Sequence, residues 1–183
     1  MMREDKKNEA GGHRPFQSQQ DPNFREAIRH LHRGEAAQAQ ALLEPLLAAH
    51  PEDIEIILNL GGAYVLLEDY EAAQALLEPA ASAHPDVANL WVNLGAARLG
   101  RLETSSRDAQ DDAIAAYEHA LAADPNVPNV HYMLGLIYQA RSDNLRAAAH
   151  LARALEQSPD DRHVQRLLQA ASRDAARANA KNN

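Results

Sequence analysis

Apolar residues recur along most of the chain at intervals of three and four, the spacing that places them on one face of a helix. The stretch from 60 to 85 shows this best, because two such amphipathic patterns follow one another with small residues on both. Small residues let two helices approach closely, while leucine and tyrosine fill the remaining space. The residues that define the pattern are Leu60, Gly61, Tyr64, Ala73, Leu77 and Ala80.

The pattern repeats with a fixed period. The interval from Pro51 to Pro85 equals the interval from Pro125 to Pro159, and both correspond to a repeat of about 34 residues. Proline stops a helix, so each marks the end of a two-helix unit. Trp91-Val92-Asn93-Leu94-Gly95 opens one copy, and the copies before and after it also contain the Leu-Gly pair and the alanines. This arrangement resembles the tetratricopeptide repeat over roughly residues 21 to 180.

The resemblance implies an all-α fold, a right-handed α-solenoid of about four helix-turn-helix units closed by a C-terminal capping helix. We expect units at 21–52, 53–86, 87–126 and 127–160, the capping helix at 161–178, and a disordered leader at 1–20. The third unit is longer, because the interval from Pro85 to Pro125 exceeds the repeat period. The excess falls in a loop insertion near 100–112. It is either a neutral surface insertion or a functional loop.

Composition and charge narrow the class of partner. The chain has no cysteine, which excludes disulfides and thiol catalysis. Its net charge of −8 is uneven, with about +1 in residues 1–20, −13 in residues 21–161 and +4 in residues 162–183. An acidic body would repel a nucleic-acid backbone, so we expect a protein or peptide partner and no nucleic acid.

Membrane and export signals are missing from the sequence pattern. The most apolar stretch, 54–67, is far shorter than the roughly 20 residues of a membrane span. The basic residues of the first 20 positions are not followed by an apolar run, as a secretory signal would require. We therefore expect no membrane span and a cytoplasmic location.

Catalytic and metal-binding motifs are also missing, so we expect a protein that is not an enzyme and needs no cofactor. The nine histidines form no HExxH or similar compact spacing. His50 and His84 each precede a repeat proline, where an imidazole suits the end of a helix. The acidic pairs Asp111-Asp112 and Asp160-Asp161 are expected to cap helix starts.

The candidate binding site is the concave groove, which the resemblance implies is lined by the first helix of each unit. Asn59 and Asn93 occupy matching positions one repeat period apart and are suited to bonding a peptide backbone; the alternative is a purely local hydrogen bond. For Leu58, Val92 and Leu99, core packing and partner binding remain equal alternatives. The predicted groove residues are Phe24, Ile28, Leu58, Asn59, Gly62, Val65, Val92, Asn93, Ala96, Leu99, Tyr132, Met133 and Leu136.

The last helix adds a basic stripe. Arg162, Arg166, Arg173 and Arg177 fall on one side of a helix, and Arg166 and Arg173 have the spacing that faces the groove in earlier units. Arginine binds carboxylates through paired charge-assisted hydrogen bonds, so the stripe could hold an acidic segment of a partner. The alternative is a solvated capping face.

These features together favour a non-enzymatic scaffold or adaptor that binds a peptide or protein segment in the groove. The alternative is a structural self-assembly subunit, a homo-oligomer formed through the groove or the leader.

Overall fold

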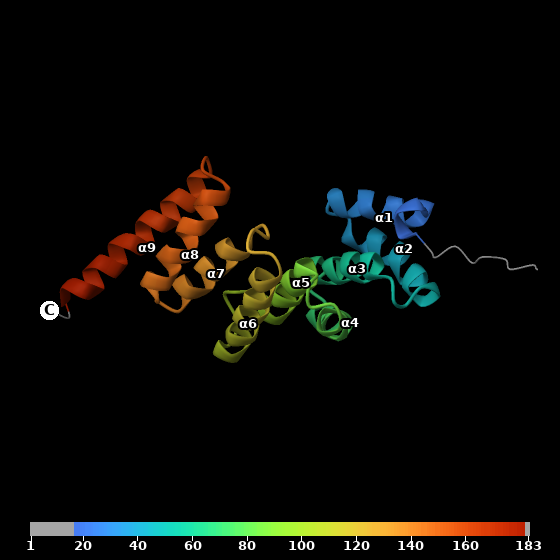
Figure 1. The fold of residues 1–183 in the computed structure, drawn as a ribbon, viewed down its shortest axis with the longest axis horizontal. Coiled ribbons are helices and arrows are strands. Elements are labelled where there is room, and N and C mark those ends of the chain that lie inside the picture. The colour runs from blue at the N-terminus through green and yellow to red at the C-terminus, as the bar shows by residue number, and fades with distance from the viewer. Residues whose placement is uncertain (1–16, 182–183) are drawn as a thin grey trace, which may run out of the picture.

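The computed structural model describes residues 17–181, so positions 1–16 of the predicted leader lie outside the described residues. From 17 to 181 the chain forms one short 3-10 helix and nine α-helices, with no strand, strung along one elongated axis (Figure 1). The elements are η1 (Ser18–Gln20), α1 (Pro22–His32), α2 (Ala36–Ala49), α3 (Ile54–Leu66), α4 (Tyr70–Ala83), α5 (Ala88–Leu99), α6 (Arg107–Ala123), α7 (Val130–Ala140), α8 (Asn144–Gln157) and α9 (Arg162–Lys181).

Consecutive helices pair into four hairpins, and α9 packs on α8 without a second helix behind it within the described chain. This confirms the all-α helical repeat. Aspartates begin several helices by accepting backbone N–H groups, which satisfies donors that a helix start leaves free. These caps are Asp21, Asp53, Asp69, Asp143 and Asp161. His50 and His84 are the C-caps of α2 and α4, as their position before the prolines predicts.

The extra residues of the third unit are divided between a turn and a helix. The α5–α6 connection spans residues 100–106, and Gly100 there has a φ of +60°, which favours glycine. Ser106 caps α6, which has 17 residues where α2, α4 and α8 have 14. The prediction that Asp111-Asp112 caps a helix is therefore wrong, because both residues lie inside α6.

The core runs through the whole stack. One cluster of buried apolar side chains joins α1, α2 and α3, and a larger one continues from α3 to α9. Phe24 and Leu99, each 3% exposed, belong to these clusters. The prediction that Phe24 lines the groove is therefore wrong, and for Leu99 the core-packing alternative holds. Leu58 and Val92 are half-buried and pack on the edge of the core.

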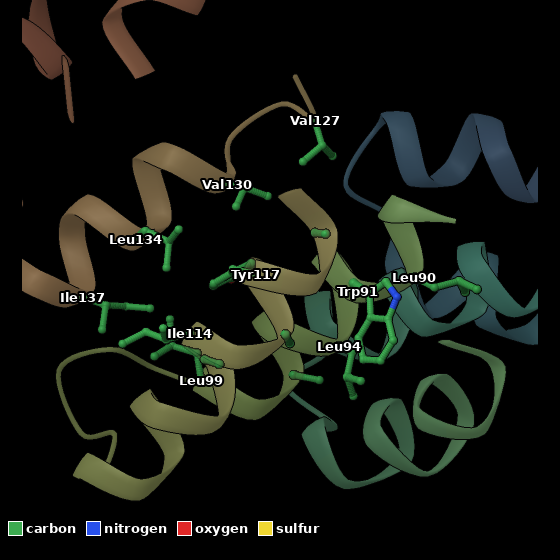
Figure 2. Close-up of a cluster of buried hydrophobic side chains, with 14 of the residues drawn as sticks. Leu90, Trp91, Leu94, Leu99, Ile114, Tyr117, Val127, Val130, Leu134 and Ile137 are labelled. Atoms are coloured by element: carbon green, nitrogen blue, oxygen red, sulfur yellow. The ribbon is translucent and has the colours of Figure 1, made fainter. Parts of the chain in front are cut away.

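The junction between the third and fourth units is made mainly by α6 and α7. Figure 2 shows Leu134 and Ile137 of α7 directed toward Tyr117 and Ile114 of α6. Burial raises the pKa of the Tyr117 hydroxyl, which keeps it neutral. α5 packs along α3, but it has almost no contact with α7.

Polar contacts of Arg141, which we call the Arg141 latch, join the same two units. The guanidinium of Arg141, at the end of α7, lies 2.6 Å from the carboxylate of Asp111. It also donates to the Gln110 side chain at 2.8 Å and to the backbone carbonyl of Arg107 at 3.1 Å. Gln110 in turn donates to the Ser105 hydroxyl at 3.1 Å. The lengthened start of α6 thus supplies every partner of a side chain that is only 9% exposed.

Candidate functional site

A hollow of about 380 Å³ lies across the first helices of the first three units. We call it the α1–α3–α5 hollow. Its wall has no charged side chain and combines aliphatic groups with three amides. The lining residues are Leu31, Leu58, Asn59, Gly62, Val65, Leu66, Asn89 and Asn93. Five of the predicted groove residues, Leu58, Asn59, Gly62, Val65 and Asn93, therefore meet in one place.

Gly62 forms the open part of this wall. A Cβ built on Gly62 would meet only the Asn93 side-chain nitrogen, at 3.4 Å. Gly61, its neighbour, instead packs against Leu77 in the core, where a Cβ would lie 2.5 Å from a leucine methyl. The two adjacent glycines thus have different roles, and only Gly62 leaves room on the groove side.

The paired asparagines make different hydrogen bonds. Asn59 Nδ2 donates to the Glu55 carbonyl of its own helix at 2.7 Å. Asn93 Nδ2 crosses from α5 to α3 and donates to the Leu58 carbonyl at 3.1 Å. Asn93 therefore ties two units together. In both residues the side-chain oxygen makes no bond to another described residue, so it can accept an N–H group from a ligand.

Sequence reasoning missed three residues of the hollow: Leu31, Leu66 and Asn89. The sequence contained a signal for two of them, since Leu31 precedes Val65 by one repeat period and Asn89 stands four residues, about one helical turn, before Asn93. Leu66 is 60% exposed, an unusual state for a leucine. Nothing in the helical pattern alone distinguishes it from the buried apolar residues of α3, such as Leu60.

The other predicted groove residues lie outside this hollow. Val92 and Ala96 are half-buried on α5, while Met133 and Leu136 are half-buried on α7. Tyr132 lines a second hollow of about 620 Å³, the α7–α9 hollow, which lies between the start of α7, the end of α8 and the start of α9. The Tyr132 hydroxyl lies 3.3 Å from Nε2 of His163.

A histidine pair joins α7 to α8. Nδ1 of His131 lies 3.1 Å from Nδ1 of His150, and the His150 ring stacks on Tyr138. Burial, and then the nearby positive charge of Arg153, lowers the pKa of His131. Burial, and then the charges of His131 and Arg146, lowers the pKa of His150. One nitrogen must donate to the other, so both rings cannot be protonated without breaking this contact.

The arginines of α9 are exposed. Arg173 donates to the Gln169 carbonyl of its own helix at 3.2 Å, and Arg177 lies 3.5 Å from Asp174. Arg166 has no ion pair with another described residue. Its guanidinium is therefore available to a ligand, whereas Arg177 is already partly neutralised.

Among the helices of residues 17–181, none combines the length and the apolarity needed to cross a lipid bilayer. Nor does this range contain three or more histidine, cysteine, aspartate or glutamate side chains arranged to hold a metal ion.

Comparison with known proteins agrees with the geometry. A tetratricopeptide repeat model matches residues 30–98, and a TPR repeat model matches residues 106–142. The two matches together cover more than half of the chain and leave out the inserted turn. No curated protein sequence matches significantly.

Solved structures of repeat proteins superpose on most of the chain. A TPR protein of Thermus thermophilus is 26% identical, with a TM-score of 0.68 over 84% of this chain and 82% of that one. MamA from AMB-1 is 24% identical, with a TM-score of 0.68 over 86% and 89%. One chain of the APC/C hetero-tetramer Cut9-Hcn1 is 25% identical, with a TM-score of 0.71 over 82% of this chain and 29% of that one.

The repeat period, the helix pairs and both family matches agree. The chain belongs to the tetratricopeptide repeat family.

Proposed function

We propose that this protein is a non-enzymatic scaffold that binds a segment of a partner protein in the α1–α3–α5 hollow. The fold and the family support a protein-interaction scaffold, and the hollow is the observation that favours this contact. A cytoplasmic location is part of the same proposal.

The chemistry of the hollow suits a peptide segment. Leu66 exposes 60% of its surface beside the half-buried Leu58 and Val65, so apolar groups of a ligand would cover surface that water now wets. The free oxygens of Asn59 and Asn93 could accept backbone N–H groups of the bound segment. A wall that combines apolar area with a few polar groups is typical of peptide sites.

A second contact region is proposed at the other end of the stack. Tyr132, Met133 and Leu136 supply half-exposed apolar surface on α7, and Arg166 and Arg173 supply exposed positive charge on α9. An acidic segment of the partner would fit this region, because arginine pairs with carboxylates in two hydrogen bonds.

The test is affinity capture from native lysate with three forms of the protein. Gly62→Leu directs a side chain into the hollow, where a Cβ meets no backbone atom, so the fold should survive. Ala115→Leu adds the same side chain at an exposed position of α6 and is the matched control. A partner that is kept by wild type and by the control but lost with Gly62→Leu supports the proposal. Equal capture by all three forms contradicts it.

Self-assembly is the second candidate, and one observation favours it. The described part of the last helix has five basic residues and one acidic residue, whereas residues 21–124 have six basic and 18 acidic residues. Opposite charges on two parts of one chain can attract two copies to each other. The mass in solution should then rise with protein concentration and fall as salt is added. A constant monomer mass would exclude this alternative.

A further inference from the structure

The region that builds the α1–α3–α5 hollow is depleted of positive charge. Between Arg33 and Arg98 the chain has no lysine or arginine, while it has ten aspartates and glutamates. This range contains α2, α3 and α4 and all but the last residues of α5. Every lining residue except Leu31 belongs to it. The uncharged, partly apolar hollow is therefore built by a segment of the chain that is rich in negative charge.

Most of this negative charge is not balanced by a cation. Glu68 pairs with Arg101, and Glu78 pairs with Arg98. Glu52, Glu55 and Asp86 are exposed and make no ion pair with another described residue. They lie close along the chain to residues of the hollow: Glu55 stands one helical turn before Asn59, Glu52 precedes α3, and Asp86 precedes Asn89 in the turn that leads into α5.

We infer that the segment bound in the α1–α3–α5 hollow combines large apolar side chains with flanking lysines or arginines. The apolar side chains cover Leu58, Val65 and Leu66, and the flanking cations approach Glu52, Glu55 and Asp86. This inference rests on the proposed function and adds the chemical class of its partner. The same three carboxylates would repel an acidic segment, which would instead bind to the arginines of α9.

The negative charge of this part of the chain also affects the rate of association. A field of one sign attracts an oppositely charged ligand before contact and accelerates its encounter. Charges on a rim contribute more to this encounter and to salt dependence than to final affinity. We therefore expect binding of a basic segment to weaken about tenfold between low and moderately high salt.

Selection from a random peptide library displayed on phage tests the inference. The wild-type protein is the target, and the Gly62→Leu protein is used to remove peptides that bind elsewhere. We expect the surviving peptides to contain large apolar residues and more lysine and arginine than aspartate and glutamate. Surviving peptides that are acidic or uncharged would overturn the inference and leave the proposed function standing. If every selected peptide also binds the Gly62→Leu protein, no peptide binds in the hollow, and the proposed function fails as well.

Two charge-neutralised variants then test whether Glu52, Glu55 and Asp86 cause the preference for basic peptides. The best selected peptide is measured against Glu52→Gln/Glu55→Gln/Asp86→Asn and against Glu71→Gln/Asp112→Asn/Glu118→Gln, which removes the same charge from exposed positions of α4 and α6. We expect the first variant to bind several-fold more weakly at low salt and with less salt dependence, and the second to behave nearly as wild type. Equal losses in the two variants would overturn the local role of the three flanking carboxylates.

Discussion

Gly95 of α5 lies directly against the ring of Tyr117 of α6: a Cβ on Gly95 would fall 2.7 Å from the ring Cε1. The same contact recurs between Gly61 and Leu77, and a Cβ on Gly135 would likewise lie 2.7 Å from Leu151 Cγ. In those two pairs the partners have the same separation in sequence, but in the third unit the separation is longer because of the insertion. The inserted residues therefore leave the close contact of the helix pair intact.

Gly95→Leu should destabilise the fold, because the buried Tyr117 ring cannot move aside. We expect a loss of about 1–3 kcal/mol or more in the free energy of unfolding, measured by urea titration. Gly62→Ala is the control. Its Cβ has room, and alanine favours a helix over glycine by up to about 1 kcal/mol. Unchanged stability of the Gly95 variant would show that the helix pair is misplaced.

The Arg141 latch should stabilise the junction between the third and fourth units. Arg141→Ala leaves Gln110 and Asp111 without their partner, and we expect a loss of about 1–2 kcal/mol, since Asp111 is 61% exposed and partly screened. Arg141→Lys should recover little, because one ammonium cannot reach all three acceptors. The control is Arg146→Ala, an exposed residue 3.5 Å from Asp143, which should change stability by less than about 0.5 kcal/mol. Equal effects of the two alanine variants would contradict the latch.

The His131–His150 pair should make the fourth unit sensitive to acid. Both pKa values are lowered in the folded state, so the unfolded chain binds more protons as pH falls below about 6.5, the ordinary value for histidine. The stability that this pair contributes is therefore fully present above about pH 6.5 and decreases as the pH falls below that value. The charges around the pair, Arg146 and Arg153, oppose protonation, and Glu156 compensates only in part.

His150→Phe keeps the ring against Tyr138 but cannot be protonated. Its urea midpoint should fall less between pH 7.5 and 5.5 than the wild-type midpoint does. His32→Gln, at an exposed site, should follow the wild type. A wild-type midpoint no more acid-sensitive than that of His150→Phe would refute the role of the pair.

The two asparagines of the hollow should respond differently to replacement. Asn59→Ala removes a bond within one helix and should weaken partner binding with little effect on stability. Asn93→Ala removes a bond between units and should also cost about 0.5–1.5 kcal/mol of stability. Calorimetric binding and urea titration of both variants separate the two effects. If both variants bound the partner as the wild type does, the two amide side chains would not be part of the binding site.

Arg166→Glu/Arg173→Glu should weaken binding of a partner that carries an acidic segment and reduce the salt dependence of its affinity. Unaltered affinity at low salt would leave α9 with a capping role only. Arg177→Glu is a useful control, because Arg177 already lies beside Asp174.

The helix pairs could be predicted because the repeat places small and large residues at fixed positions, and packing of small against large is local to each hairpin. The side chains that face the groove were harder to predict. Phe24 and Leu99 fit the spacing of the groove face, yet both side chains are buried in the core clusters. Which residues of a helix are covered depends partly on contacts between units, which a period within one unit does not record.

The position of Asp111 shows a second limit. Its sequence neighbourhood favours a cap, because acidic pairs often begin helices. The α6 helix starts earlier, at Arg107, since Ser106 supplies the cap. Asp111 is then free to bind Arg141, which belongs to the next unit of the repeat. Long-range ion pairs of this kind leave no periodic signal.

Site-specific photocrosslinking tests the central claim most directly. A photoreactive phenylalanine is placed at Leu66, which lines the α1–α3–α5 hollow, or at Leu145, which is on α8. The two leucines are 60% and 61% exposed, so they offer the reagent equal access. In cells that produce the protein, a partner segment should crosslink at position 66 and not at position 145. Crosslinking of the same partner at both positions, or only at 145, would contradict binding in the hollow.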